Sequence, residues 1–342
     1  MTLHRLRLPL QHEFTISRGS INFQNSLVVE LEEEGISGFG EVTENDYYGH
    51  TIDALSESLT AAEDLLPGYA SESPEAMWPI AQARLQNMFA LSALDMAAHD
   101  LAARKSGIPL HQHWGLAWQN VPQSSFTIGI DAIETMVAKL NERPGWKTYK
   151  IKLGAADDLA IVRALREQTN AAFRVDANCG WSVEQTIEYS TELAELGVEF
   201  IEQPLPNTAT DAEKLQVFQR SVLPIIADEN CLVEEDVARC RGFFHGVNVK
   251  LCKCGGLTPG LRMLREARQS GLKTMVGCMV ESSIGISAAA HLAPLLDYAD
   301  LDGAELLKED PAEGVVIDQG QIRLSDQPGG GARLKTSQLA SL

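Results

Sequence analysis

The fold is decided by residues 149–178, which read YKIKLGAADDLAIVRALREQTNAAFRVDAN. An apolar run opens this stretch, another closes it, and the segment between them places apolar residues three and four positions apart. That spacing is the period of a helix with one buried face. A strand, a helix and another strand in this order predict a β/α unit with parallel strands.

The same unit recurs through the second two-thirds of the chain. Eight apolar or β-branched runs start about 22–27 residues apart, close to the length of one strand plus one covering helix. Glycines at positions 197 and 271 follow helical segments and predict C-terminal caps. Eight repeats predict a β/α barrel, with a doubly wound open sheet as the alternative. The runs are SFTIGI (125–130), YKIKLG (149–154), FRVDAN (173–178), FIEQP (200–204), PIIADE (224–229), GVNVKL (246–251), KTMVGC (273–278) and YADLDG (298–303).

The first third of the chain has a different pattern. Two strand-like runs flank the turn-forming pair Glu34-Gly35, which predicts an antiparallel hairpin. A helical stretch, MFALSALDMAAHDLAARKSG (88–107), follows. We therefore predict an α+β domain over residues 1–120. The two strand-like runs are SLVVELE (26–32) and ISGFGEV (36–42).

The barrel domain is then expected over residues 121–311. After it, VVIDQGQIRL (315–324) is strand-like but cannot be a ninth barrel strand. We therefore expect residues 312–342 to return to the first domain and complete it.

Composition limits the class of partner. Acidic residues outnumber basic ones by 47 to 28, for a formal net charge of −19, which argues against nucleic acid or an anionic membrane as partner. The sequence shows neither a signal-peptide pattern nor roughly 18 consecutive apolar residues. Its six cysteines are scattered without zinc or redox spacing, which predicts reduced thiols in a cytoplasmic protein.

Three acidic residues stand at the ends of consecutive runs: Asp176, Glu202 and Asp228. The C-terminal ends of barrel strands meet at the mouth that holds the active site, so these carboxylates should converge. Each alone would more simply cap a helix or pair with a base, but three at equivalent positions favour a shared cation. Oxygen ligands suit Mg²⁺, one per subunit, with Mn²⁺ as the alternative ion.

Lysines occupy two other runs. Lys150 and Lys152 are two apart, and so lie on one face of the second strand, and Lys250 lies in the sixth. In a barrel these lysines would face each other across the mouth, whereas solvated surface lysines fit poorly inside apolar runs. Neighbouring ammonium groups beside a cation should lower the pKa of the lysine nearer the metal, and a lysine basic near neutral pH can take a proton from carbon. We expect Lys253 to point to the other strand face or into the loop, outside the catalytic set.

The last run carries two further acidic residues. Asp300 and Asp302 in ADLDG are two apart and so lie on one face. They suggest a binding site for a positively charged substrate group. A second metal or a salt bridge is the alternative.

With these residues in place, the chain resembles the enolase superfamily, specifically its muconate-lactonizing subgroup. The resemblance covers nearly the whole chain and rests on the order and spacing of several segments together. It implies an α/β fold, a modified TIM barrel (β/α)7β with an N-terminal α+β capping domain. The segments are KIK (150–152), DAN (176–178), IEQPLP (201–206), ADEN (227–230) and VNVKLCKCGGLT (247–258).

Within the subgroup, ADLDG is similar to the D-x-D motif of dipeptide epimerases, in which two aspartates hold the free α-ammonium group of the dipeptide. VGCMVESSIGISAA (276–289) is similar to the strand-seven region of that family. The resemblance implies an isomerase in which the metal holds the terminal carboxylate of the dipeptide. Lys152 then takes the α-proton of the C-terminal residue from one face, Lys250 returns it on the other, and Lys150 tunes Lys152.

The substrate implied is an L-Ala-X dipeptide. Members selective for Ala-Glu carry an additional Arg just after an R-G-S sequence, whereas Ile21 follows Arg18-Gly19-Ser20 here, which favours an apolar X. Glu44 and Asp46 in the neighbouring segment keep a cationic X open. Expected substrate contacts are Ile21, Thr127 and Met279 beside Asp300 and Asp302, with Phe23, Tyr47 and Tyr48 as pocket walls.

Two other enzymes would share the lysines and the metal acids: o-succinylbenzoate synthase and N-acylamino acid racemase. Neither needs an ammonium-binding pair, so Asp300 and Asp302 disfavour both. A degenerate barrel kept for binding should have lost at least one of the six core residues, and all six are present. The sequence leaves a homo-oligomer open.

Overall fold

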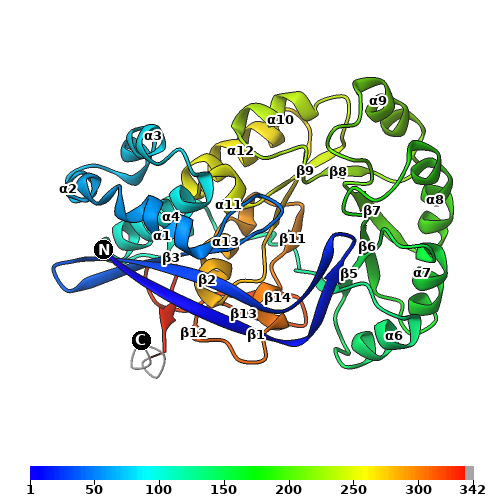
Figure 1. Ribbon diagram of the computed structural model, residues 1–342, viewed down its shortest axis with the longest axis horizontal. Helices are drawn as coiled ribbons and strands as arrows, with labels where there is room; N and C mark the ends of the chain where they lie inside the picture. The colour runs from blue at the N-terminus through cyan, green and yellow to red at the C-terminus, as the bar shows by residue number, and fades with distance from the viewer. Residues whose placement is uncertain (336–342) are drawn as a thin grey trace.

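Three long antiparallel strands open the chain in the computed structural model, which describes residues 1–335 (Figure 1). The predicted hairpin is confirmed: β2 and β3 pair from Ser26 opposite Thr43 to Glu33 opposite Ile36. An additional edge strand, β1, pairs with β2 and was not predicted. The three are β1 (Thr2–Ile16), β2 (Gly19–Glu33) and β3 (Ile36–Thr43).

Helices cover one face of this sheet. The predicted helix is α4, which packs against β3 and buries residues on nearly all of its faces. The helices are α1 (Ile52–Thr60), η1 (Glu63–Leu65), α2 (Leu66–Tyr69), α3 (Pro74–Leu85), α4 (Met88–Lys105) and α5 (Leu110–His113).

All eight predicted barrel strands are present. They form one parallel sheet in chain order, which excludes the doubly wound alternative, because that fold reverses its strand order. A bridge between Ser124 and Ala299 joins the first strand region to the last. The strands are β4 (Phe126–Ile128), β5 (Thr148–Lys152), β6 (Ala172–Asp176), β7 (Val198–Glu202), β8 (Ile225–Ala227), β9 (Gly246–Val249), β10 (Lys273–Gly277) and β11 (Tyr298–Asp300).

Each of the first seven strands is followed by at least one α-helix, and β11 by a 3-10 turn, which is the expected (β/α)7β pattern. Gly197 and Gly271 have φ of +73° and +75° and end helices as predicted. The helices are α6 (Ile133–Asn141), α7 (Asp158–Arg166), α8 (Val183–Glu195), α9 (Asp211–Arg220), α10 (Glu234–Cys240), α11 (Leu251–Cys254), α12 (Leu257–Gln269) and α13 (Ser283–Ala290), with the 3-10 turns η2 (Ala293–Leu295) and η3 (Gly303–Leu306).

The tail contacts both parts of the molecule. Ala312 and Leu334 share an apolar cluster with Val28 of the first sheet, whereas Ile317 and Ile322 belong to the barrel core. The domain boundaries at residues 120 and 311 stay predictions, and residues 336–342 of the expected returning tail lie outside the described residues. The tail strands are β12 (Ala312–Glu313), β13 (Val316–Asp318), β14 (Gln321–Arg323) and β15 (Arg333–Leu334).

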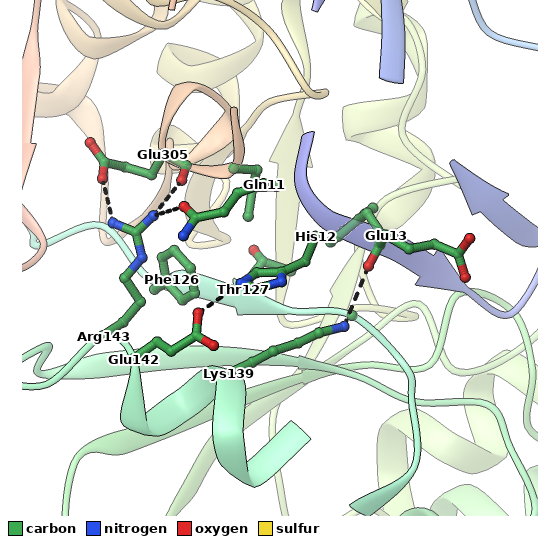
Figure 2. Close-up of a pocket in the computed structure, with 12 residues that line it drawn as sticks. Gln11, His12, Glu13, Phe126, Thr127, Lys139, Glu142, Arg143 and Glu305 are labelled. Carbon is green, nitrogen blue, oxygen red and sulfur yellow. Dashed lines mark hydrogen bonds and ion pairs between the residues drawn. The ribbon is translucent and has the colours of Figure 1, made fainter. Parts of the chain in front are cut away.

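The β1–β2 hairpin lies across the barrel and is attached to α6 (Figure 1 and Figure 2). His12 Nε2 lies 2.7 Å from Glu142 Oε2, and Arg143 donates to Gln11 Oε1 at 3.0 Å and to the Glu305 carbonyl at 2.9 Å. The small cavity enclosed there, about 30 Å³, has room for one or two waters rather than a substrate. These contacts fix the hairpin so that its turn, residues 17–18, reaches the barrel mouth.

Two further predictions concern the whole chain. All six cysteines lie among the described residues and are free thiols, as predicted. Among residues 1–335, every helix is too short or too polar to cross a membrane.

Candidate active site

A cavity of about 580 Å³ opens at the C-terminal ends of the barrel strands. Its volume is in the range of small-molecule sites. Strand-end residues form its floor, and the turn of the β1–β2 hairpin and the segment 44–48 form its outer wall. The lining includes every residue predicted to contact substrate, namely Ile21, Thr127, Met279, Asp300 and Asp302, together with Lys150, Lys152 and Lys250.

The three predicted metal ligands come together below this cavity. Asp176, Glu202 and Asp228 end or directly follow β6, β7 and β8, are fully buried, and each offers an oxygen within 4.8 Å of the others. Burial opposes ionisation of Asp176, but Lys152 and Lys150 lower its pKa to about 2. Burial and the neighbouring Asp176 carboxylate raise the pKa of Glu202 to about 7. The carboxylates therefore repel one another, which a shared cation would relieve.

The donor set fits a hard divalent cation. Lys150 Nζ lies 2.7 Å from Glu202 Oε2, yet this buried oxygen accepts no hydrogen bond of normal geometry. The Lys150 ammonium group balances the charge of this oxygen, but the missing hydrogen bond leaves it free to bind a further positive ligand. Three carboxylate oxygens are ligands that Mg²⁺ takes readily, with water or substrate oxygens completing the octahedron.

The two lysines predicted to transfer the proton approach the acids from two sides. Lys152 Nζ donates to Asp176 Oδ2 at 2.7 Å, and Lys250 Nζ donates to Asp228 Oδ2 at 3.1 Å. Their strands, β5 and β9, are the second and sixth of eight, so they lie on opposite sides of the barrel. Burial lowers the pKa of Lys250, but the Asp228 carboxylate outweighs it and raises that pKa above its ordinary value.

Lys150 has a different environment from Lys152. Its ammonium group lies 2.7 Å from Asp300 Oδ2, 2.7 Å from Glu202 Oε2 and 3.2 Å from Asp176 Oδ2. Burial lowers its pKa, but these three carboxylates outweigh burial and raise it well above the ordinary value. Lys150 therefore stays charged and balances the acids.

The expected direction of the Lys253 side chain was wrong, whereas its place outside the catalytic set stays a prediction. Its side chain is buried and points into the site, where Nζ donates to Asp228 Oδ1 at 2.5 Å and to the Asp228 carbonyl at 2.7 Å. The chain leaves the strand at Lys250 and turns once through α11, which brings Lys253 back to the same side. Strand alternation, on which the expectation rested, no longer applies there.

Asp300 and Asp302 both face the cavity, as their spacing predicted. Asp300 accepts from Ser125 Oγ at 2.7 Å and from Lys150 Nζ at 2.7 Å. Asp302 accepts from the Thr127 N–H at 2.5 Å and from Thr127 Oγ1 at 3.2 Å. Burial and the nearby Asp300 charge raise the pKa of Asp302 to about 7. Among residues 1–335 no cationic side chain forms a salt bridge with Asp302, so it is suited to receive a cationic group of a substrate.

The hairpin turn adds an ion pair that the sequence did not predict. Arg18 Nη2 lies 2.9 Å from Glu229 Oε1, Arg18 Nη1 donates to the Asn178 carbonyl at 3.2 Å, and the guanidinium lies over the Tyr47 ring. These contacts join the turn to the loops that follow β6 and β8. They hold Ile21, 37 % exposed, at the cavity wall.

The sequence matches known families over most of its length. Residues 2–115 match the family model described as mandelate racemase / muconate lactonizing enzyme, N-terminal domain, and residues 132–338 match the one described as enolase C-terminal domain-like.

Relatives and solved structures agree with these matches. The chain is 53% identical over 335 residues to a Flavobacterium johnsoniae protein named L-Ala-D/L-amino acid epimerase, covering 98% of this chain and 99% of that one. It is 39% identical to a Roseobacter litoralis protein named hydrophobic dipeptide epimerase, covering 97% and 98%. Its structure is similar to a dipeptide epimerase from Cytophaga hutchinsonii complexed with Mg and the dipeptide D-Ala-L-Val, with a TM-score of 0.92, 29% identity and coverage of 99% and 96%.

Proposed function

The chain belongs to the mandelate racemase / muconate lactonizing enzyme family of the enolase superfamily, and we propose that it is a dipeptide epimerase that inverts the C-terminal residue of L-Ala-X, with X apolar. One observation carries this proposal. A single cavity brings together two lysines from opposite strands, three buried carboxylates and the acid pair Asp300 and Asp302.

The acid pair would bind the amino end of the dipeptide. Asp302 accepts hydrogen bonds from Thr127, and Asp300 is shared with Lys150, so both carboxylates are held rigidly. An α-ammonium group placed between them would make charge-assisted hydrogen bonds. Substrates without a free amine, such as N-acylamino acids or a succinylbenzoate precursor, would bring no positive charge to Asp302 and leave Asp300 with Lys150 alone.

The carboxylate end of the dipeptide would lie at the metal. Asp176, Glu202 and Asp228 would hold one Mg²⁺, with Mn²⁺ as an alternative ion. When bound there, Mg²⁺ supplies positive charge that stabilises the negative charge developing on the substrate carboxylate as the α-proton leaves.

Proton transfer would use the two opposed lysines. Neutral Lys152 takes the α-proton of residue X from one face, and the Lys250 ammonium returns a proton to the other face. Each inversion leaves Lys152 charged and Lys250 neutral; Lys152 then gives a proton to solvent and Lys250 takes one from it, so the starting state is restored and no net acid or base is consumed. The raised pKa of Lys250 suits a proton donor, and permanently charged Lys150 helps to neutralise the surrounding acids.

The side chain of X would face the hairpin turn. Ile16, Ile21, Phe23 and Tyr47 line this part of the cavity and offer it apolar surface. Arg18 is already paired with Glu229, so it is less available to a glutamate side chain. This arrangement supports an apolar X over an acidic one.

The direct test is α-proton exchange. The protein is incubated with Mg²⁺ and a panel of L-Ala-X dipeptides in deuterated water, and incorporation is followed by mass spectrometry. We expect one deuterium in residue X, fastest for apolar X, and appearance of the L-Ala-D-X epimer on a chiral column. No exchange with any dipeptide, together with dehydration of the succinylbenzoate precursor or racemisation of N-acylamino acids, would overturn the proposal.

Two controls test whether the exchange depends on the substrate amine and on Lys152. An N-acetylated L-Ala-X differs only at the amine and should exchange far more slowly if the acid pair binds the ammonium. Lys152→Ala protein, checked for folding by circular dichroism, should lose epimerisation. An unchanged rate in this variant would exclude Lys152 as a base.

A further inference from the structure

Each carboxylate of the metal triad has one oxygen held by a donor from outside the triad. Asp176 Oδ1 accepts from the Asn178 N–H at 2.9 Å, Glu202 Oε1 accepts from Asn248 Nδ2 at 2.8 Å, and Asp228 Oδ1 accepts from Lys253 Nζ at 2.5 Å. The other oxygen of each acid lies beside a lysine. All three acids therefore have the same arrangement. We call the oxygen held by the outside donor the anchored oxygen and the one beside Lys152, Lys150 or Lys250 the inner oxygen.

The inner oxygens are the ones that a cation would use. Asp176 Oδ2 lies 2.7 Å from Lys152 Nζ, Glu202 Oε2 lies 2.7 Å from Lys150 Nζ, and Asp228 Oδ2 lies 3.1 Å from Lys250 Nζ. A carboxylate anchored through one oxygen cannot rotate freely. Its second oxygen is then presented in one direction, which is how outer donors tune metal ligands.

Lys253 differs from the other two anchors because it is charged and bonds twice. Besides Asp228 Oδ1, its ammonium group donates to the Asp228 backbone carbonyl at 2.7 Å, so it fixes both the side chain and the main chain of that residue. The Lys253 side chain is only 1% exposed, so water does not compete for these bonds. Asp228 Oδ2 is left to Lys250.

We propose that Lys253 is a positioning residue that fixes Asp228 as a metal ligand and, through Asp228, places the ammonium group of Lys250. This inference rests on the proposed metal site and the proposed role of Lys250. Lys253 touches Asp228 rather than the cavity, since it is absent from the residues that line it. Lys253 should therefore act on proton transfer only indirectly. It should affect transfer by Lys250 more than transfer by Lys152, because Lys152 is held by Asp176 instead.

The first test measures metal binding without turnover. Lys253→Met removes both donor and charge at similar length, and Lys253→Gln keeps a neutral donor. Calorimetric titration with Mg²⁺ or Mn²⁺ should give an affinity about 10–100-fold weaker for the Met variant and a smaller loss for the Gln variant. Lys273→Met is the matched control, because Lys273 is 54% exposed at the start of β10 and should leave the affinity unchanged.

The second test measures proton exchange separately on the two faces of the substrate α-carbon. α-Deuterium exchange is measured separately from pure L-Ala-L-X and pure L-Ala-D-X. The exchange that depends on Lys250, identified with the Lys250→Ala protein, should fall further in Lys253→Met than the exchange that depends on Lys152. A merely structural role would lower both exchanges alike.

The outcomes separate this inference from the proposed function. If the parent protein exchanges no dipeptide but Lys253→Met still weakens metal binding, the positioning of Asp228 stands and the assigned reaction fails. Parental metal affinity in Lys253→Met, or an equal fall in both exchanges, overturns the inference. If the Met variant does not fold, the Gln variant carries the test, and unfolding of both would assign Lys253 to the fold instead.

Discussion

Asp302→Asn should remove the pH dependence that Asp302 gives to dipeptide binding. Burial and the Asp300 charge raise the pKa of Asp302 to about 7. Below that pH the carboxyl group is protonated and cannot pair with an ammonium group, whereas above it the carboxylate can. Affinity contributed by Asp302 should therefore appear as the pH rises through about 7, and an asparagine cannot supply it at any pH.

The size of the effect follows from that pKa. The carboxyl group is roughly one-tenth ionised at about pH 6 and roughly nine-tenths ionised at about pH 8, so its contribution should grow roughly tenfold. A charge-assisted hydrogen bond is worth about 1.5–3 kcal/mol, or roughly 10–150-fold in affinity. The ratio of parent to variant kcat/KM should thus rise from a few-fold at about pH 5.5 to roughly 10–150-fold at about pH 8.

The assay compares the two proteins at each pH with one apolar L-Ala-X and saturating Mg²⁺. The ratio cancels the titration of the substrate's own ammonium group, which loses its proton near pH 8, and of the lysines common to both proteins. Asn can still accept from the Thr127 N–H, so the fold around it should be retained. A ratio that does not change with pH, or a variant as active as the parent at about pH 8, would refute the assignment of Asp302 to the ammonium group.

Three further predictions follow from the same structure. Lys152→Ala and Lys250→Ala should each lower the rate of epimerisation roughly 10²–10⁴-fold. Each variant should still exchange the α-proton of one pure epimer, and the epimer should differ between the two variants. Exchange from both epimers would contradict two bases on opposite faces. Ile21→Arg should shift the kcat/KM ratio towards L-Ala-L-Glu over L-Ala-L-Leu by roughly fivefold, a modest change because position 21 is 37% exposed and screened by water; an unchanged ratio would place X elsewhere. Burial raises the pKa of Asp95 to about 7, above its unfolded value of 3.8, so the parent should lose stability as the pH rises from about 4 to about 7, by at most roughly 4 kcal/mol, and stay level above that. Asp95→Asn, whose Oδ1 can still accept from the Thr258 N–H, should melt with less dependence on pH between about 4 and 7, and an identical dependence would exclude Asp95 as its source.

The barrel could be predicted because each of its strands carries a local signal. A short apolar or β-branched run occurs eight times, the first seven are each followed by a helix, and all eight are strands. The edge strand β1 lacks this signal. Leu6, Leu8 and Leu10 alternate along it, but Pro9 lies between two of them and the buried position before them is taken by His4 against Glu30, so the apolar pattern is short. An edge strand tolerates proline because one side of it makes no ladder bonds.

The residues of the candidate site fall into the same two groups, those with a local signal in the sequence and those without one. Residues within strands, such as Lys152 and Asp300, follow strand alternation, so their direction could be predicted from their spacing. Lys253 and Arg18 lie just outside strands, where alternation ends, and their partners depend on a one-turn helix and on a hairpin turn. The signal that could have identified Lys253 is its place one helical turn beyond Lys250, combined with its apolar neighbours. No local pattern pairs Arg18 with Glu229, because the two are brought together only by the docking of the hairpin on the barrel.

The charge balance of the site explains why a proton-abstracting lysine and a divalent cation are expected together. Apart from Glu229, whose charge is balanced by Arg18, five carboxylates and four ammonium groups are buried at the strand ends, so the ionised set has one net negative charge, and each of these lysines is held by a carboxylate. The carboxylates favour the charged forms of Lys150, Lys250 and Lys253, whose pKa values they raise above the ordinary value. Two positive charges from a metal ion would change the net charge of this set from negative to positive. Loss of one proton from a lysine would then make the set neutral. The same acids that keep the lysines protonated would then bind the ion that releases a base, which couples proton abstraction to metal binding. The set is Asp176, Glu202, Asp228, Asp300 and Asp302 with Lys150, Lys152, Lys250 and Lys253.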